Sequence, residues 1–268
     1  MNILDLKLKL IFFDNPISRF YLKFLSNKNY VNKIIIFTNY FIFKKFFAYK
    51  NFVNNNSFPL LFLKKNKSRY FIDFVEDFFN LEKNFILDTY EFNNINSFDI
   101  EYVNASSVNS VNSLNFFERF TSNNFLYTGR EIIKKNVLNT GNNFYHFHPG
   151  YIPEMKGADI SLRSVFYRNH IGCSFFQINE KIDSGCILFR EKYKIDLKKF
   201  QKLKYLNSKD FYNFWYSFID PCIRLDLLKK LIFKKKNLFK LMHEDLSEEN
   251  NYFSFLTKGD IKKLYDKL

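Results

Sequence analysis

The start of the chain carries a strand-like apolar run, a helix signal and a second strand-like run in close succession. The apolar runs are residues 8–13 and 33–37, and Asp14-Asn15-Pro16 supplies a turn and a helix start before residues 17–25. A strand, a helix and a strand within about thirty residues form a βαβ unit, which requires parallel strands and a right-handed crossover. The chain therefore begins as a Rossmann-like layer. Because no Gly-x-Gly-x-x-Gly motif follows the first strand, a dinucleotide is not predicted as a ligand.

The alternation of helices and strands returns after residue 110. Helices are predicted at residues 111–120, 131–138 and 159–167, with Asp159 as a candidate N-cap of the last one. Strands are predicted at residues 124–127, 144–148, 172–178 and 186–193. Residues 41–100 have no clear period and receive no assignment. We therefore predict an α/β fold, a Rossmann-like three-layer domain with a mostly parallel sheet, over residues 1–195.

The pattern changes to Lys-rich helical segments in residues 196–268. Two such segments, residues 208–219 and 223–233, are separated by Pro221, which is expected to break the helix. Residues 252–268 are predicted to form a short strand or loop and one more helix. This part of the chain is therefore predicted to be a small, mainly helical C-terminal extension packed on the first domain.

Composition limits the classes of protein that the chain can belong to. The hydrophobic fraction of 47% excludes a disordered chain. The 41 basic and 27 acidic residues give a net charge of +14, which on its own would favour a nucleic-acid partner. However, Lys, Asn, Phe, Ile and Tyr are all abundant together, as an AT-rich coding bias would produce. A generally basic surface is therefore favoured over a dedicated polyanion site.

Cysteines and apolar runs indicate the compartment. Cys173, Cys186 and Cys222 are odd in number and form no Cys-x-x-Cys pair, so neither a disulfide framework nor a zinc site is predicted. Lysines interrupt the Phe-rich runs before they reach the length of a membrane span, and Asp5 lies where a signal peptide would need a basic start. We expect a cytoplasmic protein in a reducing compartment without a membrane partner. The sequence indicates no oligomeric state.

Two histidines at the end of a predicted strand form the candidate site. His146 and His148 alternate with apolar residues, so both side chains point to one face, and Pro149 ends the strand in a loop. An open α/β sheet binds its ligand at such strand ends. Asp183 follows in an Asp-Ser-Gly turn, where Asp is also an ordinary turn residue. These side chains could bind a metal, perform acid–base chemistry on a carbonyl, or be structural. A metal would need a further ligand, and no His-Glu-x-x-His or Cys-rich motif supplies one, so no metal is predicted.

The segments around these residues resemble the folate-dependent formyltransferase family, which includes methionyl-tRNA, glycinamide ribonucleotide and sugar-amine formyltransferases. The family has a strand ending in Asn-x-His-Pro, then an apolar-apolar-Pro and a basic-Gly step, and later Asp-x-Gly before an Ile-Leu strand. The matching segments here are His148-Pro149-Gly150, Ile152-Pro153, Lys156-Gly157 and Asp183-Ser184-Gly185-Cys186-Ile187-Leu188. The likeness is specific from Tyr127 to Leu188 and architectural from Leu8 onward. At the position of the family Asn, this chain has His146.

The resemblance implies a reaction and a role for each matched residue. The formyl donor would be 10-formyltetrahydrofolate, and an amine would attack its formyl carbon. His148 would contact the developing oxyanion and assist proton transfer, and Asp183 would hold that imidazole and favour its protonated form. His146 would be the second oxyanion donor, titrating near its ordinary pKa of about 6.5. The remaining matched residues would contact the two substrates. Gly129, Arg130, Ile132 and Ile133 would line the folate pocket, and Gly150, Pro153, Lys156 and Gly157 would contact the acceptor.

The favoured acceptor is a primary amine of a small molecule, with an activated amino sugar as the first choice. The mainly helical tail does not resemble the five-stranded barrel that methionyl-tRNA formyltransferases append. Initiator tRNA nevertheless stays the second choice because of the charge of +14. A folate-dependent hydrolase, a silent folate-binding module in which His146 has abolished the chemistry, and a metal-dependent enzyme remain as other classes.

Overall fold

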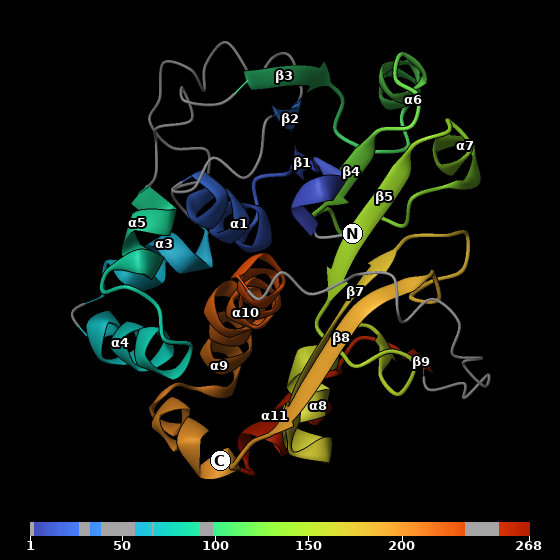
Figure 1. The fold of residues 1–268 in the computed structure, drawn as a ribbon. Coiled ribbons are helices and arrows are strands. Elements are labelled where there is room, and N and C mark those ends of the chain that lie inside the picture. The colour runs from blue at the N-terminus through green and yellow to red at the C-terminus, as the bar shows by residue number, and fades with distance from the viewer. Residues whose placement is uncertain (1–2, 27–32, 39–56, 66, 92–98, 234–251) are drawn as a thin grey trace.

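The computed structural model describes residues 3–26, 33–38, 57–65, 67–91, 99–233 and 252–268. Within these residues, seven strands form one sheet in the order β3-β2-β1-β4-β5-β7-β8 (Figure 1). These strands are β1 Lys9–Phe12, β2 Lys33–Thr38, β3 Asp99–Asn104, β4 Asn124–Tyr127, β5 Asn143–His148, β7 His170–Gln177 and β8 Ile187–Lys194. Neighbouring strands from β3 to β5 are parallel, whereas β7 is antiparallel to both β5 and β8. The predicted Rossmann-like fold with a mostly parallel sheet is confirmed.

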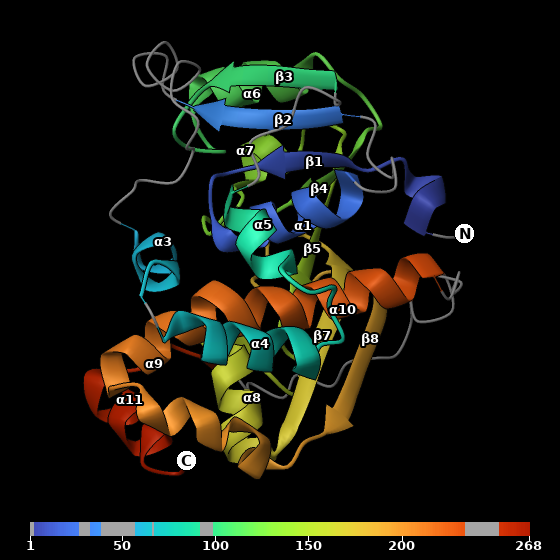
Figure 2. The ribbon, with the colours of Figure 1, turned by 90° about the vertical axis from the view of Figure 1, so that its left-hand side faces the viewer.

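Helices cover both faces of this sheet (Figures 1 and 2). They are α1 Pro16–Ser26, α3 Phe58–Leu63, α4 Ser68–Phe78, α5 Phe85–Glu91, α6 Val111–Glu118, α7 Lys135–Leu138, α8 Ile160–Arg168, α9 Ser208–Phe214, α10 Asp220–Phe233 and α11 Lys258–Tyr265. Shorter elements are the 3-10 segments Ile3–Leu6 and Leu197–Tyr205, the π-helical turn Trp215–Ile219, and a small sheet that pairs β6 Lys156–Gly157 with β9 Tyr252–Phe253. No helix in the described ranges combines the length and apolarity needed to cross a membrane.

Alternating side chains of β1 and β5 pack into two separate hydrophobic cores, one on each face of the sheet. Leu10 and Phe12 of β1 join the larger core, which lies against α1, α8 and α10, whereas Ile11 joins the smaller core beneath α6 and α7. Strand β5 alternates in the same way, with Tyr145 and Phe147 in the larger core. Figure 2 shows α10 running alongside α1 and across β7, and both contacts are close. The result is the three-layer arrangement expected for a sheet that is buried on both faces.

The predicted helix at residues 131–138 is mostly wrong, because only α7, Lys135–Leu138, forms. Upstream of α7, the backbone N–H of Lys134 donates to Oδ1 of Asn109 at 2.8 Å. Ile133 is buried in the smaller core. These long-range contacts hold the segment extended, and local periodicity does not register them.

Pro221 does not break the C-terminal helix as predicted. The π-helical turn Trp215–Ile219 connects α9 directly to α10, and Pro221 lies in the first turn of α10. A proline has no N–H to offer the carbonyl of the residue four positions earlier, which here is Ser217. The hydroxyl of Tyr90 donates to that carbonyl at 2.8 Å. A side chain from α5 therefore satisfies the acceptor that Pro221 leaves open.

Asp159 is not the side-chain N-cap that the sequence suggested. Its backbone has a left-handed φ of 55°, and its side chain makes no capping hydrogen bond. Instead, its carboxylate accepts hydrogen bonds from the Tyr212 hydroxyl at 3.0 Å and from the Leu256 backbone N–H at 2.7 Å. The residue therefore joins the start of α8 to α9 and to the segment that follows β9.

The unassigned region 41–100 is partly described. Its described residues form α3, α4 and α5 and the start of β3, and Phe62, Phe71 and Phe85 enter the larger core. Residues 39–56, 66 and 92–98 lie outside the described residues.

Candidate active site

His148 ends β5 and meets Asp183 from the turn before β8. Nδ1 of His148 lies 3.6 Å from Oδ1 of Asp183, which is an ion-pair distance and longer than an ordinary hydrogen bond. The other carboxylate oxygen of Asp183 accepts a hydrogen bond from the backbone N–H of Gly157 at 2.8 Å. Nε2 of His148 lies 3.0 Å from the Met155 carbonyl, and since a carbonyl can only accept, Nε2 carries a proton. The imidazole is 3% exposed, so this pair lies beneath the loop that follows β5.

Glycine is required where that loop crosses His148. A Cβ on Gly150 would lie 2.7 Å from the Met155 carbonyl oxygen and 2.9 Å from Nε2 of His148. Both distances are shorter than the contacts that Cβ atoms make in proteins. Any larger residue at position 150 would therefore push the loop away from the imidazole.

His146 is held by protein groups at both ring nitrogens. Its Nδ1 lies 2.9 Å from the Tyr127 carbonyl and must donate to it, so Nδ1 carries the proton. Its Nε2 lies 3.1 Å from Nη1 of Arg224 and accepts from that guanidinium. No N–H of His146 is then free for the oxyanion role that the family resemblance implied.

Burial controls the protonation of both histidines. Burial, followed by the positive charge of Arg224, lowers the pKa of His146 to about 4. The expectation that His146 titrates near its ordinary pKa is therefore wrong. Burial also lowers the pKa of His148, while the Asp183 carboxylate acts in the opposite direction. A buried imidazole is neutral near pH 7 unless its partners outweigh the loss of hydration.

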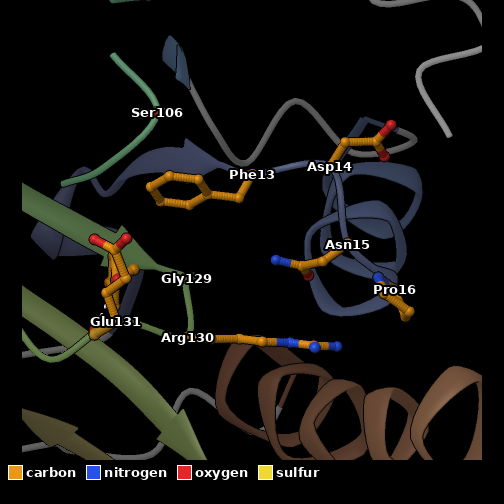
Figure 3. A pocket seen from close by; sticks show the side chains of 9 residues that line it. Phe13, Asp14, Asn15, Pro16, Ser106, Gly129, Arg130 and Glu131 are labelled. Carbon is orange, nitrogen blue, oxygen red and sulfur yellow. Dashed lines mark hydrogen bonds between the residues drawn. The ribbon is translucent and has the colours of Figure 1, made fainter. Parts of the chain in front are cut away.

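A cavity lies beside these residues, at the carboxyl ends of β1 and β4. It has a volume of about 370 Å³ and is lined by Phe13, Asp14, Asn15, Pro16, Ser106, Tyr127, Gly129, Arg130 and Glu131 (Figure 3). Strands β2 and β4 flank β1, so the chain leaves β1 at the point where the strand order reverses, and open α/β sheets bind ligands there. Phe13 and Tyr127 meet edge to face at 5.9 Å, and the Arg130 side chain extends across the cavity toward Pro16 (Figure 3).

Tyr127 connects the cavity to the histidines, because its residue lines the cavity and its carbonyl accepts from His146. Gly129 has no room for a side chain, since a Cβ there would lie 2.3 Å from the Tyr127 hydroxyl. This hydroxyl donates to the backbone carbonyl of Glu131 at 2.8 Å. The loop after β4 therefore packs against the side chain of Tyr127, the last residue of that strand.

The structure separates the residues that the sequence assigned to the folate pocket. Gly129 and Arg130 line the cavity, whereas Ile132 and Ile133 are not among its lining residues. Ile132 is 59% exposed, and Ile133 is buried in the smaller core at 3% exposure. The residues assigned to the acceptor all lie in the segment that follows β5. Gly150 lies against His148, and Gly157 donates to Asp183. Pro153 and Lys156 lie between these two glycines in the sequence.

Sequence reasoning missed two parts of this site. The residues from Phe13 to Pro16, which line the cavity, directly follow a predicted strand. Because open α/β sheets bind ligands at the carboxyl ends of their strands, this position could have identified them. Arg224 was also missed, although Asp220 and Arg224 are oppositely charged residues four apart in the part of α10 that precedes its other charged residues. Such a pair signals buried polar contacts, but the sequence does not show that the contact is His146. In the described ranges, no three His, Cys, Asp or Glu side chains form a group that could hold a metal ion.

Comparison with known proteins gives structural similarity and no sequence match. No family model and no curated protein matches the chain. The structure is similar to WlaRD, a sugar 3N-formyl transferase solved in the presence of dTDP and 5-N-formyl-THF, with 18% identity, a TM-score of 0.41, and coverage of 92% of this chain and 69% of that chain.

Two further solved structures are similar to the chain. A 4-N formyltransferase from Francisella tularensis has 14% identity and a TM-score of 0.44, with coverage of 97% of this chain and 86% of that chain. Methionyl-tRNA formyltransferase from Clostridium thermocellum has 14% identity and a TM-score of 0.41, with coverage of 88% and 81%. All three solved structures are described as formyltransferases.

Proposed function

We propose that this protein transfers a formyl group from 10-formyltetrahydrofolate to a primary amine of a small molecule, with an activated amino sugar as the favoured acceptor. The observation that carries the proposal is the approach of His148 and Asp183 to 3.6 Å, beneath a loop that matches the formyltransferase motif. We place the reaction in the domain of residues 1–195, with the mainly helical residues 196–268 packed on it.

Formyl transfer to an amine requires a proton acceptor for the attacking amine and a donor for the developing oxyanion. It also requires a proton for the folate nitrogen, which leaves when its bond to the formyl carbon breaks. The formyl donor supplies the electrophilic carbon. His148 is a suitable proton carrier because burial lowers its pKa and favours the neutral ring. To accept the amine proton at Nε2, the ring must be in the tautomer whose proton lies on Nδ1, beside Asp183. Asp183 stabilises the ring once it is charged. Because Nε2 of His148 donates to the Met155 carbonyl in this structure, a substrate must replace that carbonyl before Nε2 can act on it.

The cavity offers groups that fit parts of a folate. Phe13 and Tyr127 provide aromatic surface for a flat ring, and the Arg130 guanidinium offers a cation for a carboxylate. A volume of about 370 Å³ lies within the range of small-molecule pockets. On this basis we assign Gly129 and Arg130 to folate binding, whereas Ile132 and Ile133 are not among the residues that line this cavity.

The loop after β5 is the proposed acceptor site. Gly157 donates its backbone N–H to Asp183, so this loop is tied to the proposed catalytic carboxylate. Lys156 adjoins Gly157 and brings a positive charge that suits the phosphate of an activated sugar. Gly150 and Pro153 complete the proposed contact surface.

Activity is tested with 10-formyltetrahydrofolate and a panel of nucleotide-linked amino sugars, with the products identified by mass spectrometry. We expect a formamide product with the wild type. His148→Ala and Asp183→Asn should each lower kcat/KM by about 100-fold or more. His170→Ala and Asp99→Asn are matched controls outside the site and should keep activity. Release of formate without a formamide would indicate a hydrolase, and full activity of either site variant would exclude the assigned roles.

The net charge of +14 favours a second candidate acceptor, an aminoacylated tRNA. Binding to tRNA can be measured on filters across a salt series. A tRNA enzyme would lose affinity steeply with rising salt, because each phosphate contact releases counterions. A flat salt response, together with sugar formylation, would favour the small-molecule acceptor.

A further inference from the structure

A buried ion pair on α10 reaches into the proposed site. Nε of Arg224 donates to Oδ2 of Asp220 at 2.8 Å, one helical turn away. Both residues are buried, with 9% and 2% of their surface exposed. The Asp220 carboxylate is fixed in turn by the Ser161 hydroxyl at 2.7 Å, and this hydroxyl accepts from Nε1 of Trp215 at 3.0 Å. The guanidinium therefore has a defined position, because its partner is itself anchored.

Strand β4 ends before β5 does, near the point where Arg224 contacts His146. The register between β4 and β5 runs only as far as Leu126 opposite Tyr145. Beyond that pair, Nη1 of Arg224 donates to the Phe147 carbonyl and to Nε2 of His146.

Stability alone does not account for this arrangement. Removing two charges from water is costly, and apolar residues of similar volume often stabilise a core as well as a buried ion pair does or better. Buried ionic groups are best explained where they fix the geometry of a neighbour. The neighbour here is His146, the residue at the position of the family Asn.

We propose that Arg224, anchored by Asp220, is a positioning residue for formyl transfer that holds His146 as a neutral ring with its proton on Nδ1. An imidazole has two tautomers and a charged form, whereas an amide has only one state at neutral pH. The guanidinium can only donate, so it selects the tautomer with a lone pair on Nε2. The Tyr127 carbonyl can only accept, so it selects the same tautomer from the other side. His146 thereby gains the single fixed state of an amide.

Four groups decide whether His146 takes up a proton. Arg224 from α10 and His148 from β5 oppose the charge, the Asp183 carboxylate from the turn before β8 favours it, and so does the Tyr127 carbonyl of β4. Burial is the largest influence and Arg224 is the next, and both act against protonation. Removal of the guanidinium charge should therefore raise the pKa of His146.

The state of His146 can be read by two-dimensional NMR of ¹⁵N-labelled histidines, because the chain has only 4 histidines. His146→Asn identifies the signal. In the wild type we expect the Nδ1–H tautomer, unchanged from pH 8 to pH 5. An Nε2–H tautomer, or protonation of His146 near pH 6.5, would overturn the proposal. This measurement does not depend on any enzymatic activity, although the role in formyl transfer rests on the proposed function.

The double variant Asp220→Asn with Arg224→Gln removes both charges; Asn keeps the size of Asp220, and Gln keeps one amide donor on a shorter side chain than that of Arg224. We expect the pKa of His146 to rise by about one unit or more, with a mixture of tautomers. Arg224→Lys retains the charge and should keep the ring neutral. Lys230→Gln removes one charge from the same helix, where Lys230 pairs with Asp226 and Glu191, and should leave His146 unchanged. An unchanged titration in the double variant would overturn the proposal.

Activity gives the second readout. With the double variant, the protonation of His146 should lower kcat/KM about tenfold between pH 7 and pH 4, whereas in the wild type the same titration should lower it only about twofold over that range. If the titration of His146 moves and formyl transfer does not, Arg224 has no positioning role in the reaction. If no variant, including the wild type, transfers formyl groups while the NMR result holds, the proposed function fails and the control of His146 stands.

Discussion

His146 shows how a titratable side chain can be confined to one state. Its ring offers one donor and one acceptor when neutral, and the Tyr127 carbonyl and the Arg224 guanidinium match them one to one. The ring has a defined orientation for this reason. A third binding event at the same ring would have to displace one of these partners.

The depressed pKa of His146 predicts a loss of stability in acid. The folded-state pKa is about 4, whereas an unfolded histidine titrates near 6.5. Between these values the unfolded chain binds more protons, so stability is complete above about pH 6.5 and falls as the pH drops toward about 4. The expected contribution is about 3 kcal/mol.

The measurement is the free energy of unfolding by urea between pH 7 and pH 4.5, compared for the wild type and His146→Asn. Because an amide does not titrate, the variant should show a shallower loss. Parallel curves for the two proteins would mean that His146 is protonated normally in the folded state. His148 and His170 contribute to both curves, since burial lowers the pKa of each, and they therefore cancel in the difference.

Among the elements, the continuous helix from α9 to α10 is the one that local sequence rules would have divided. A proline usually interrupts a helix, because it lacks a backbone N–H. Pro221 instead lies in the first turn of α10, directly after a π-helical turn. The hydroxyl of Tyr90 donates a hydrogen bond to the Ser217 carbonyl. In a regular α-helix, the backbone N–H of a residue other than proline at position 221 would make this hydrogen bond. A contact between α5 and the π-helical turn thus permits the proline.

Tyr90→Phe should destabilise the fold, because it leaves the buried Ser217 carbonyl without this donor. The expected loss is about 1 to 3 kcal/mol in the free energy of unfolding. Tyr205→Phe is a matched control, since Tyr205 is highly exposed, and it should change stability by less than about 0.5 kcal/mol. Pro221→Ala restores a backbone N–H at position 221, so the cost of Tyr90→Phe should be smaller in that background. Additive losses in the double-mutant cycle would exclude this explanation.

At the scale of the whole molecule, contacts far apart in the sequence hold the proposed acceptor loop. Strand β9 pairs with β6, so Tyr252–Phe253 lies along Lys156–Gly157. A Cβ on Gly157, which has a φ of 102°, would lie 2.2 Å from the Phe253 carbonyl oxygen. The Asp159 carboxylate then connects this end of the chain to α8 and α9 through Leu256 and Tyr212.

Asp159→Ala should loosen this assembly, since it leaves the Leu256 N–H and the Tyr212 hydroxyl without their acceptor. We expect a loss of about 2 to 4 kcal/mol in stability. We also expect faster amide hydrogen exchange in residues 252–257. Asp226→Ala removes a carboxylate from a partly exposed ion pair and should cost about 1 kcal/mol or less. Equal losses for the two variants would show that Asp159 does not join these segments.

The sequence predicted the elements whose signals are local and repeated. The apolar runs at β1, β2, β4 and β5 were found because strands buried on both faces are continuously apolar, and alternation placed Tyr145 and Phe147 opposite the histidines. The segment at residues 131–134 was assigned wrongly, because the Asn109 side chain binds its backbone from another part of the chain. Periodicity within a short window does not report such contacts.

The sequence by itself determined the Rossmann-like sheet and the strand end that carries His146 and His148, because hydrophobic period and proline chemistry act over a few residues. Only the tertiary structure decided which partner each imidazole has. Asp183 reaches His148 across the turn before β8, and Arg224 reaches His146 from 78 residues away, where β4 ends short of its neighbour. Hydrogen-bond partners, burial and therefore pKa depend on this packing, and no local pattern specifies them.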